Sequence, residues 1–146
     1  RILPEFVAQN PRYERIGLRD LCQQIHEAYR EQDVARLTTE MYLSDLQPAM
    51  TPTDAYAKMA HRDIERVEID QLEGRITAAL VTPYPPGIPL LIPGERFNAP
   101  IMRYLKFARD FNLRFPGFAT DVHGLVTETD ASGNKRYFVD CVRNAD

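Results

Sequence analysis

The chain has 146 residues, of which 44% are hydrophobic and 27% charged, and its formal net charge at pH 7 is −3. This composition is typical of a globular protein that can bury one core, so we expect a single domain over residues 1–146. The acidic balance argues against nucleic acid as a partner, and no apolar run approaches the about 18 residues that would span a membrane.

The chain opens without Met in a proline-punctuated stretch, RILPEFVAQNPRYERIG. Proline fixes φ and removes a backbone donor, so we expect an extended opening segment over residues 1–16. The missing Met leads us to expect that the chain is part of a longer protein. The two cysteines, Cys22 and Cys141, do not indicate a disulfide framework and favour reduced thiols in a cytoplasmic protein.

Residues 17–61 are predicted to be helical. Apolar residues recur at helical spacing with charged residues between them, which is typical of amphipathic helices. Asp33 is a candidate N-cap for the second helix, and Thr51-Pro52 is a candidate start for the third. The predicted helices cover residues 17–32, 34–46 and about 52–61.

Residues 62–146 change in character. Short apolar runs bounded by Gly and Pro predict strands, and a long amphipathic run after Asn98 predicts a helix. The predicted elements are strands at 64–69 and 75–82, a helix at 98–114, and a terminal hairpin of 124–130 and 135–142. Helices followed by mixed elements predict the α+β class, with helices packed on a small antiparallel or mixed sheet.

The segment TPYPPGIPLLIPGERF, residues 82–97, is apolar but too rich in proline for a helix or a central strand. One interpretation is a structural crossover loop packed on the sheet. The other is a rigid wall of a ligand site, because a stiff loop loses little conformational entropy when a ligand binds. The acidic residue of this segment, Glu95, would attract a cationic substrate or form a salt bridge. The candidate site residues of this segment are Tyr84, Pro85, Pro86, Gly87 and Glu95.

Asp121 and His123 are two residues apart, which would place both on one face of a strand. The carboxylate could orient a general base, or the two side chains could form a purely structural hydrogen bond. No histidine has the spacing of a metal pair, so no metal site is expected. The cysteines lack a CxxC arrangement, and no glycine-rich phosphate motif is present.

The chain has three lysines, Lys58, Lys106 and Lys135. A lysine that forms a Schiff base must be desolvated or held by a charged partner. None of the three lies in a predicted pocket. We therefore expect no complete catalytic constellation within this chain.

Two motifs carry a resemblance to a known family. PYPPGIPLLIPGE, followed about twenty residues later by FPGFATDVHG, closely resembles the C-terminal domain of the bacterial ornithine/lysine/arginine decarboxylases. The resemblance covers essentially the whole chain, including NPRYERIGLRDLCQQIH and YFVDCV. These segments look most like the ornithine-specific branch, although PYPPG and PGE are similar in the lysine and arginine enzymes.

The resemblance implies a pyridoxal-phosphate-dependent carboxy-lyase that converts L-ornithine to putrescine and CO₂ in polyamine biosynthesis. In this family the lysine that binds the cofactor lies in a preceding domain, so no catalytic residue and no bound cofactor are expected here. The implied partners are that preceding domain and further copies of the subunit, in a homodimer or higher oligomer. Tyr84 to Gly87 match a family position toward the active-site mouth. Asp121 and His123 are candidate supporting residues because of their spacing, and the resemblance assigns them no role.

Three alternatives stay open. The parent could act on lysine or arginine instead of ornithine. The chain could be a stand-alone small-molecule-binding module with the 82–97 loop as its pocket. It could also be an interaction module that docks onto an acidic partner through the basic face of the 98–114 helix, which carries Arg103, Lys106, Arg109 and Arg114.

Overall fold

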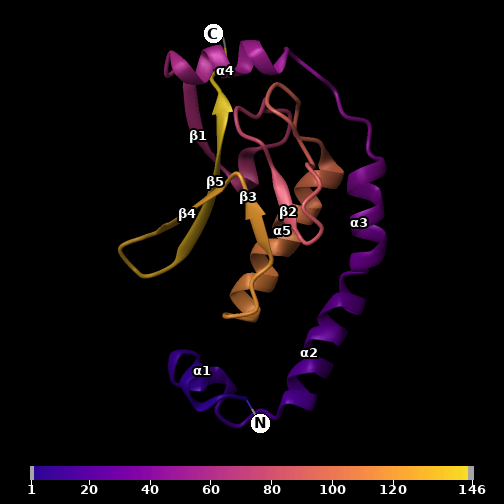
Figure 1. Cartoon of the computed structure of the whole chain (residues 1–146), viewed down its shortest axis with the longest axis vertical. Coiled ribbons are helices and arrows are strands. Elements are labelled where there is room, and N and C mark those ends of the chain that lie inside the picture. The colour runs from indigo at the N-terminus through magenta and orange to yellow at the C-terminus, as the bar shows by residue number, and fades with distance from the viewer. Residues whose placement is uncertain (1, 145–146) are drawn as a thin grey trace.

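The computed structural model describes residues 2–144, so the predicted domain limits at residues 1 and 146 lie outside the described residues. The helices are α1 (Pro4–Gln9), α2 (Leu18–Glu31), α3 (Val34–Leu43), α4 (Pro52–Ala60) and α5 (Ala99–Arg114), with short 3-10 helices η1 (Pro11–Tyr13) and η2 (Ile69–Gln71). The strands are β1 (Ile64–Glu68), β2 (Thr82–Tyr84), β3 (Asp121–His123), β4 (Leu125–Thr129) and β5 (Lys135–Val142). Figure 1 shows α2 and α3 curving along one side of the strands, with α5 behind them.

The strands form two antiparallel sheets. One has the order β1-β5-β4, and the other is the two-stranded ribbon β2-β3. In the larger sheet Val139 is opposite both Val67 and Leu125, so apolar side chains line one face. The predicted α+β class is confirmed, and the sheets are antiparallel rather than mixed.

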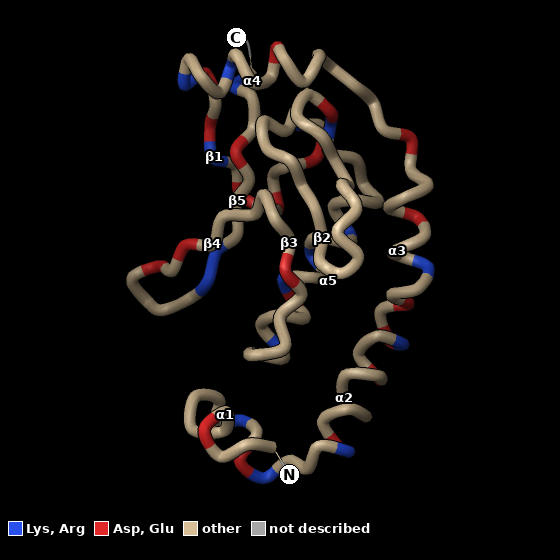
Figure 2. Tube along the Cα trace, in the orientation of Figure 1, with Lys and Arg blue, Asp and Glu red and all other residues tan. Residues whose placement is uncertain are grey.

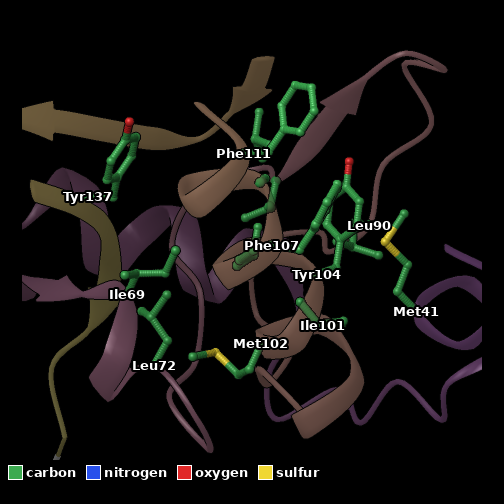
Figure 3. Packing of buried hydrophobic residues seen from close by; sticks show 14 of the residues in the cluster. Met41, Ile69, Leu72, Leu90, Ile101, Met102, Tyr104, Phe107, Phe111 and Tyr137 are labelled. Atoms are coloured by element: carbon green, nitrogen blue, oxygen red, sulfur yellow. The ribbon is translucent and has the colours of Figure 1, made fainter. Parts of the chain in front are cut away.

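Helix α5 supplies the centre of the core. Its N-cap Asn98 accepts a hydrogen bond from the Ile101 backbone N–H at 3.1 Å, and Pro100 occupies the first turn, where its missing donor does no harm. Figure 3 shows the inner face of this helix packed against residues of η2, α3 and the 82–97 loop. The buried residues of α5 are Ile101, Met102, Tyr104, Leu105, Phe107, Ala108 and Phe111.

The opening segment is helical where the sequence predicted an extended chain over residues 1–16. Pro4 begins α1, a position that proline favours because its fixed φ suits the first turn. Aromatic contacts then hold the segment against the turn that follows α5. Phe6 and Tyr13 stack at 5.7 Å, Phe118 packs edge-on against both, and the Tyr13 hydroxyl donates to the Pro116 carbonyl at 2.9 Å.

Two local predictions at helix ends also differ. Asp33 has a left-handed backbone with φ of 45° and makes no side-chain cap, so it turns the chain between α2 and α3. Helix α3 ends at Leu43 instead of residue 46, because Ser44 is extended and donates its hydroxyl back to the Met41 carbonyl. The predicted Thr51 cap is confirmed by a hydrogen bond from the Asp54 N–H at 3.1 Å.

The predicted strand at 75–82 is mostly irregular. Only its last residue belongs to β2, and the rest pairs through isolated bridges, such as Thr77 with Cys141 and Val81 with Leu91. The segment crosses between two partners and does not follow one, so no continuous ladder forms. It is still well buried at Thr77, Ala78 and Val81, as its apolar composition suggested.

Candidate functional site

The β2-β3 ribbon gathers the polar residues that the sequence singled out. Tyr84 is opposite Asp121, and Thr82 is opposite His123. Directly opposite residues share a face of an antiparallel pair, and so do residues two apart. All four side chains therefore belong to one face, which we call the ribbon face.

The ribbon face carries a contact cluster of three exposed side chains. The Tyr84 and His123 rings have centroids 4.6 Å apart and planes tilted by 38°. His123 Nε2 lies 3.1 Å from Asp121 Oδ2, within hydrogen-bonding distance. Tyr84 is 47% exposed, and the other two side chains are exposed as well, so a docking molecule could reach all three.

The Pro85–Gly87 turn holds the Tyr84 ring. Gly87 has a φ of 83° and donates its N–H to the Pro83 carbonyl at 2.8 Å. A Cβ at Gly87 would lie only 2.9 Å from Cε1 of the Tyr84 ring, so the turn packs directly on that ring. The conformation and the closeness both require glycine.

Thr82 is a member of the ribbon face that sequence reasoning missed. It is buried, and its hydroxyl has no hydrogen-bond partner among residues 2–144. An unsatisfied buried hydroxyl costs about 1–3 kcal/mol, so it is an unusual feature. Its spacing of two residues from Tyr84 could have placed both side chains on one face. No sequence signal showed that β2 begins at Thr82, because the residues before it form no regular strand.

Glu95 does not join the ribbon face. Its Oε2 accepts a hydrogen bond at 2.8 Å from the backbone N–H of Ile92 and so closes its own turn. It forms no salt bridge with a described residue, which contradicts one interpretation of this carboxylate. The Glu95 carboxylate is therefore held by the Ile92 amide, three residues before it, and not by a basic side chain.

The loop beside the ribbon face presents apolar side chains to solvent. Figure 2 shows that residues 82–94 carry no charge. The loop lies next to the end of α3, where the Tyr42 hydroxyl donates a long hydrogen bond of 3.4 Å to the Ile88 carbonyl. The large exposed apolar residues here are Ile88 and Ile92 in the loop, Leu43 and Leu46 at and after the end of α3, and Leu80 before β2; we call these five residues the loop face. Contiguous exposed apolar patches mark interaction sites, so the uncharged loop and its exposed neighbours are a candidate contact surface.

The basic side chains of α5 are engaged by acids of the same chain. Arg103 pairs with Glu40 at 2.9 Å, Arg109 with Asp70 at 2.8 Å, and Arg114 with Glu31 at 3.2 Å. Lys106 also reaches Asp70, at 3.3 Å. The helix face is therefore largely neutralised, which weakens the case for docking onto an acidic partner.

The remaining reactive groups form no catalytic centre in the part of the chain that the structure describes. Lys58 is exposed and paired with Asp63, and Lys135 is exposed at the start of β5. Burial raises the pKa of the Cys141 thiol to about 12, so it is not a nucleophile. No metal-binding group of three ligands occurs within residues 2–144. Over the same range no helix combines the length and the apolar character needed to cross a bilayer.

Comparison with known proteins gives consistent matches. Residues 35–143 match the family described as Orn/Lys/Arg decarboxylase, C-terminal domain. The chain is 44% identical over 146 residues to lysine decarboxylase LdcA of Pseudomonas aeruginosa, covering 97% of the chain and 19% of that protein. It is 38% identical over 141 residues to the constitutive ornithine decarboxylase of Escherichia coli, covering 94% and 20%.

Among solved structures, the constitutive lysine decarboxylase of Escherichia coli superposes with a TM-score of 0.84 at 31% identity, over 96% of this chain and 20% of that one. The chain thus spans about a fifth of the length of the proteins that it matches.

Proposed function

Because the chain belongs to the family of Orn/Lys/Arg decarboxylase C-terminal domains, we propose that it is the last part of a subunit that decarboxylates a basic L-amino acid. The family match, over most of the chain, carries this proposal. The fold supports it, since the same arrangement of helices and antiparallel sheets occurs in a decarboxylase of known structure.

The substrate is lysine or ornithine. Sequence resemblance predicted ornithine, with putrescine as the product, and the similarity to an ornithine decarboxylase supports it. That preference is not confirmed, because the identity to a lysine decarboxylase is higher. We therefore place lysine first and ornithine second, with arginine as the remaining member of the family's substrate class.

Pyridoxal phosphate is the proposed cofactor of the complete subunit. When bound, it supplies an electron sink for the negative charge left at Cα as CO₂ departs. The residues of this chain do not fit as its binding site, because Lys58, Lys106 and Lys135 are exposed or ion-paired. We assign the cofactor to the preceding domain.

We assign the ribbon face to the active-site entrance. The Tyr84 ring is fixed by Gly87 and His123, so it can border a substrate channel without reordering. Asp121 adds a negative charge that favours the approach of a basic amino acid. Pro85 and Pro86 stiffen the same rim. Glu95, occupied by its own turn, takes a structural role in this proposal.

The loop face is the proposed contact with the rest of the subunit. Covering it would remove exposed leucine and isoleucine side chains from water, at about 25 cal/mol per Å² of apolar surface. The expected partner is the cofactor domain, in a cytoplasmic enzyme that forms a homodimer or a higher homo-oligomer.

The substrate proposal is tested with the complete subunit and added pyridoxal phosphate. CO₂ release is measured from L-lysine, L-ornithine and L-arginine, with the 146-residue chain alone as the control. We expect release by the complete subunit from lysine or ornithine, and none by the short chain. A preference for ornithine would restore the first prediction, and a preference for arginine would contradict both candidates. A folded subunit that releases no CO₂ from any of the three would overturn the proposed function.

A further inference from the structure

A polar hollow of about 490 Å³ lies between the end of α5, strand β3 and the β4-β5 hairpin. Small-molecule sites usually occupy roughly 300–1,000 Å³, so the hollow is large enough for a metabolite. It shares Asp121 with the ribbon face but otherwise has its own walls. The polar residues that matter here are Asn112, Asp121, Thr127, Lys135 and Tyr137.

The hairpin register brings the donors of this hollow together. Thr127 is opposite Tyr137, and Thr129 is opposite Lys135. Lys135 and Tyr137 are two residues apart on β5, so their side chains share a face of the sheet. Further along the same face Leu125 meets Val139, so the donors lie where the apolar core gives way to solvent.

The Tyr137 hydroxyl is the unusual group. The residue as a whole is only 7% exposed, and its hydroxyl, which forms no hydrogen bond to a residue from 2 to 144, lies at the open wall of the hollow. Figure 3 shows the hydroxyl pointing away from Ile69 and the rest of the labelled cluster. The hydroxyl is not among the buried atoms that lack a partner, so it opens to the solvent of the hollow and is available as a donor there.

The charges around the hollow have both signs. Lys135 has no ion-pair partner among the described residues. Burial raises the pKa of Tyr137, and the positive charge of Arg109 opposes that rise. Asp121 contributes a carboxylate, and only its Oδ2 is engaged, by His123.

We propose that this hollow binds a small zwitterion, a free basic amino acid, at a site separate from the chemistry of decarboxylation. Lys135 and the Tyr137 hydroxyl take the carboxylate, because both are donors that lack a partner. Asp121 takes an ammonium group. The choice of a basic amino acid rests on the proposed function, but binding to this chain requires neither cofactor nor reaction, so a failure here would leave that function standing.

The test is titration calorimetry of the 146-residue chain with L-lysine and, in parallel, with 1,5-diaminopentane, which has no carboxylate. We expect saturable binding of L-lysine with a Kd on the order of 1 mM, and at least about tenfold weaker binding of the diamine. Tyr137→Phe and Lys135→Gln should each weaken lysine binding by about fivefold or more. Circular dichroism verifies that both variants are folded.

Two matched variants complete the design. Tyr56→Phe alters an exposed tyrosine on α4, and Lys106→Gln alters a lysine on α5 that is paired with Asp70. Both should bind lysine as the unaltered chain does. The proposal is overturned if lysine binding does not saturate, if the diamine binds equally well, or if the Tyr137 and Lys135 variants bind lysine unchanged.

Discussion

Replacing Gly124 by alanine should lower the free energy of unfolding of the chain by at least about 3 kcal/mol. Gly124 connects β3 to β4 and has a φ of 92°, a conformation that disfavours any residue with a Cβ. A Cβ at this position would also lie only 2.3 Å from the Leu80 carbonyl oxygen. A backbone carbonyl cannot move aside as a flexible side chain does. We therefore expect the β3-β4 connection to separate from the backbone at Leu80, just before β2.

Gly133→Ala is the matched control for this prediction. Gly133 has nearly the same backbone conformation, with a φ of 85°, but a Cβ there would meet nothing within 4 Å. It should therefore show only the backbone penalty, about 1 kcal/mol. Urea unfolding of the two variants measures the difference. Equal losses in both would mean that the close approach to Leu80 has no energetic consequence.

The second large effect is expected in the core of α5. Leu105 is fully buried, and Leu105→Ala should lower the free energy of unfolding by about 3–5 kcal/mol. The loss has two parts: the lost burial of the Cγ methine with its two methyl groups, and the cavity left among neighbours that cannot collapse. Thermal unfolding monitored by circular dichroism would show a large drop in Tm.

Leu113→Ala on the same helix separates burial from helix propensity. Leu113 is 53% exposed, so its truncation should change stability by no more than about 0.5 kcal/mol. Both substitutions place alanine in α5, and only the packing differs. If Leu113→Ala proved as damaging as Leu105→Ala, the orientation of this helix in the core would be wrong.

Local signals predicted the regular elements well. Helical spacing of apolar residues located α2 and α5, and the Gly133 region located the terminal hairpin. Helix α1 was missed because its prolines were taken as breakers. The contacts that hold it, such as Phe6 with Phe118, join residues about a hundred positions apart. Propensity alone carries no trace of such a contact.

Three of the four members of the ribbon face were predictable from the sequence, whereas Thr82 and the assembly of the four were not. Tyr84, Asp121 and His123 were each named from the sequence, and the spacing of the last two was correctly placed on one side of a strand. The contact between Tyr84 and His123 depends on the pairing of β2 with β3, two three-residue strands that no sequence pattern announces. For Glu95 the predicted salt bridge does not form with a described residue, because the Ile92 amide holds its carboxylate, and its place at the entrance stays a prediction.

The division of residues 1–16, 17–61 and 62–146 into an opening segment, a helical part and a sheet-containing part stays a prediction as a statement about domains. Its second boundary, between residues 61 and 62, falls between α4 and β1, where the chain changes from helix to strand. The contribution of the family resemblance was different in kind. The resemblance implied a preceding domain that carries the cofactor, which composition and periodicity could not indicate.

The assignment of the ribbon face to the active-site entrance is tested most directly by kcat/KM of Tyr84→Ala in the complete subunit, measured together with its unfolding temperature. Tyr56→Ala, at an exposed tyrosine on α4, is the control. We expect Tyr84→Ala to lower kcat/KM by about three- to tenfold with a nearly unchanged unfolding temperature, and the control to change neither. Unchanged kinetics with a lowered unfolding temperature would show that Tyr84 only stabilises the fold, and would contradict the assignment.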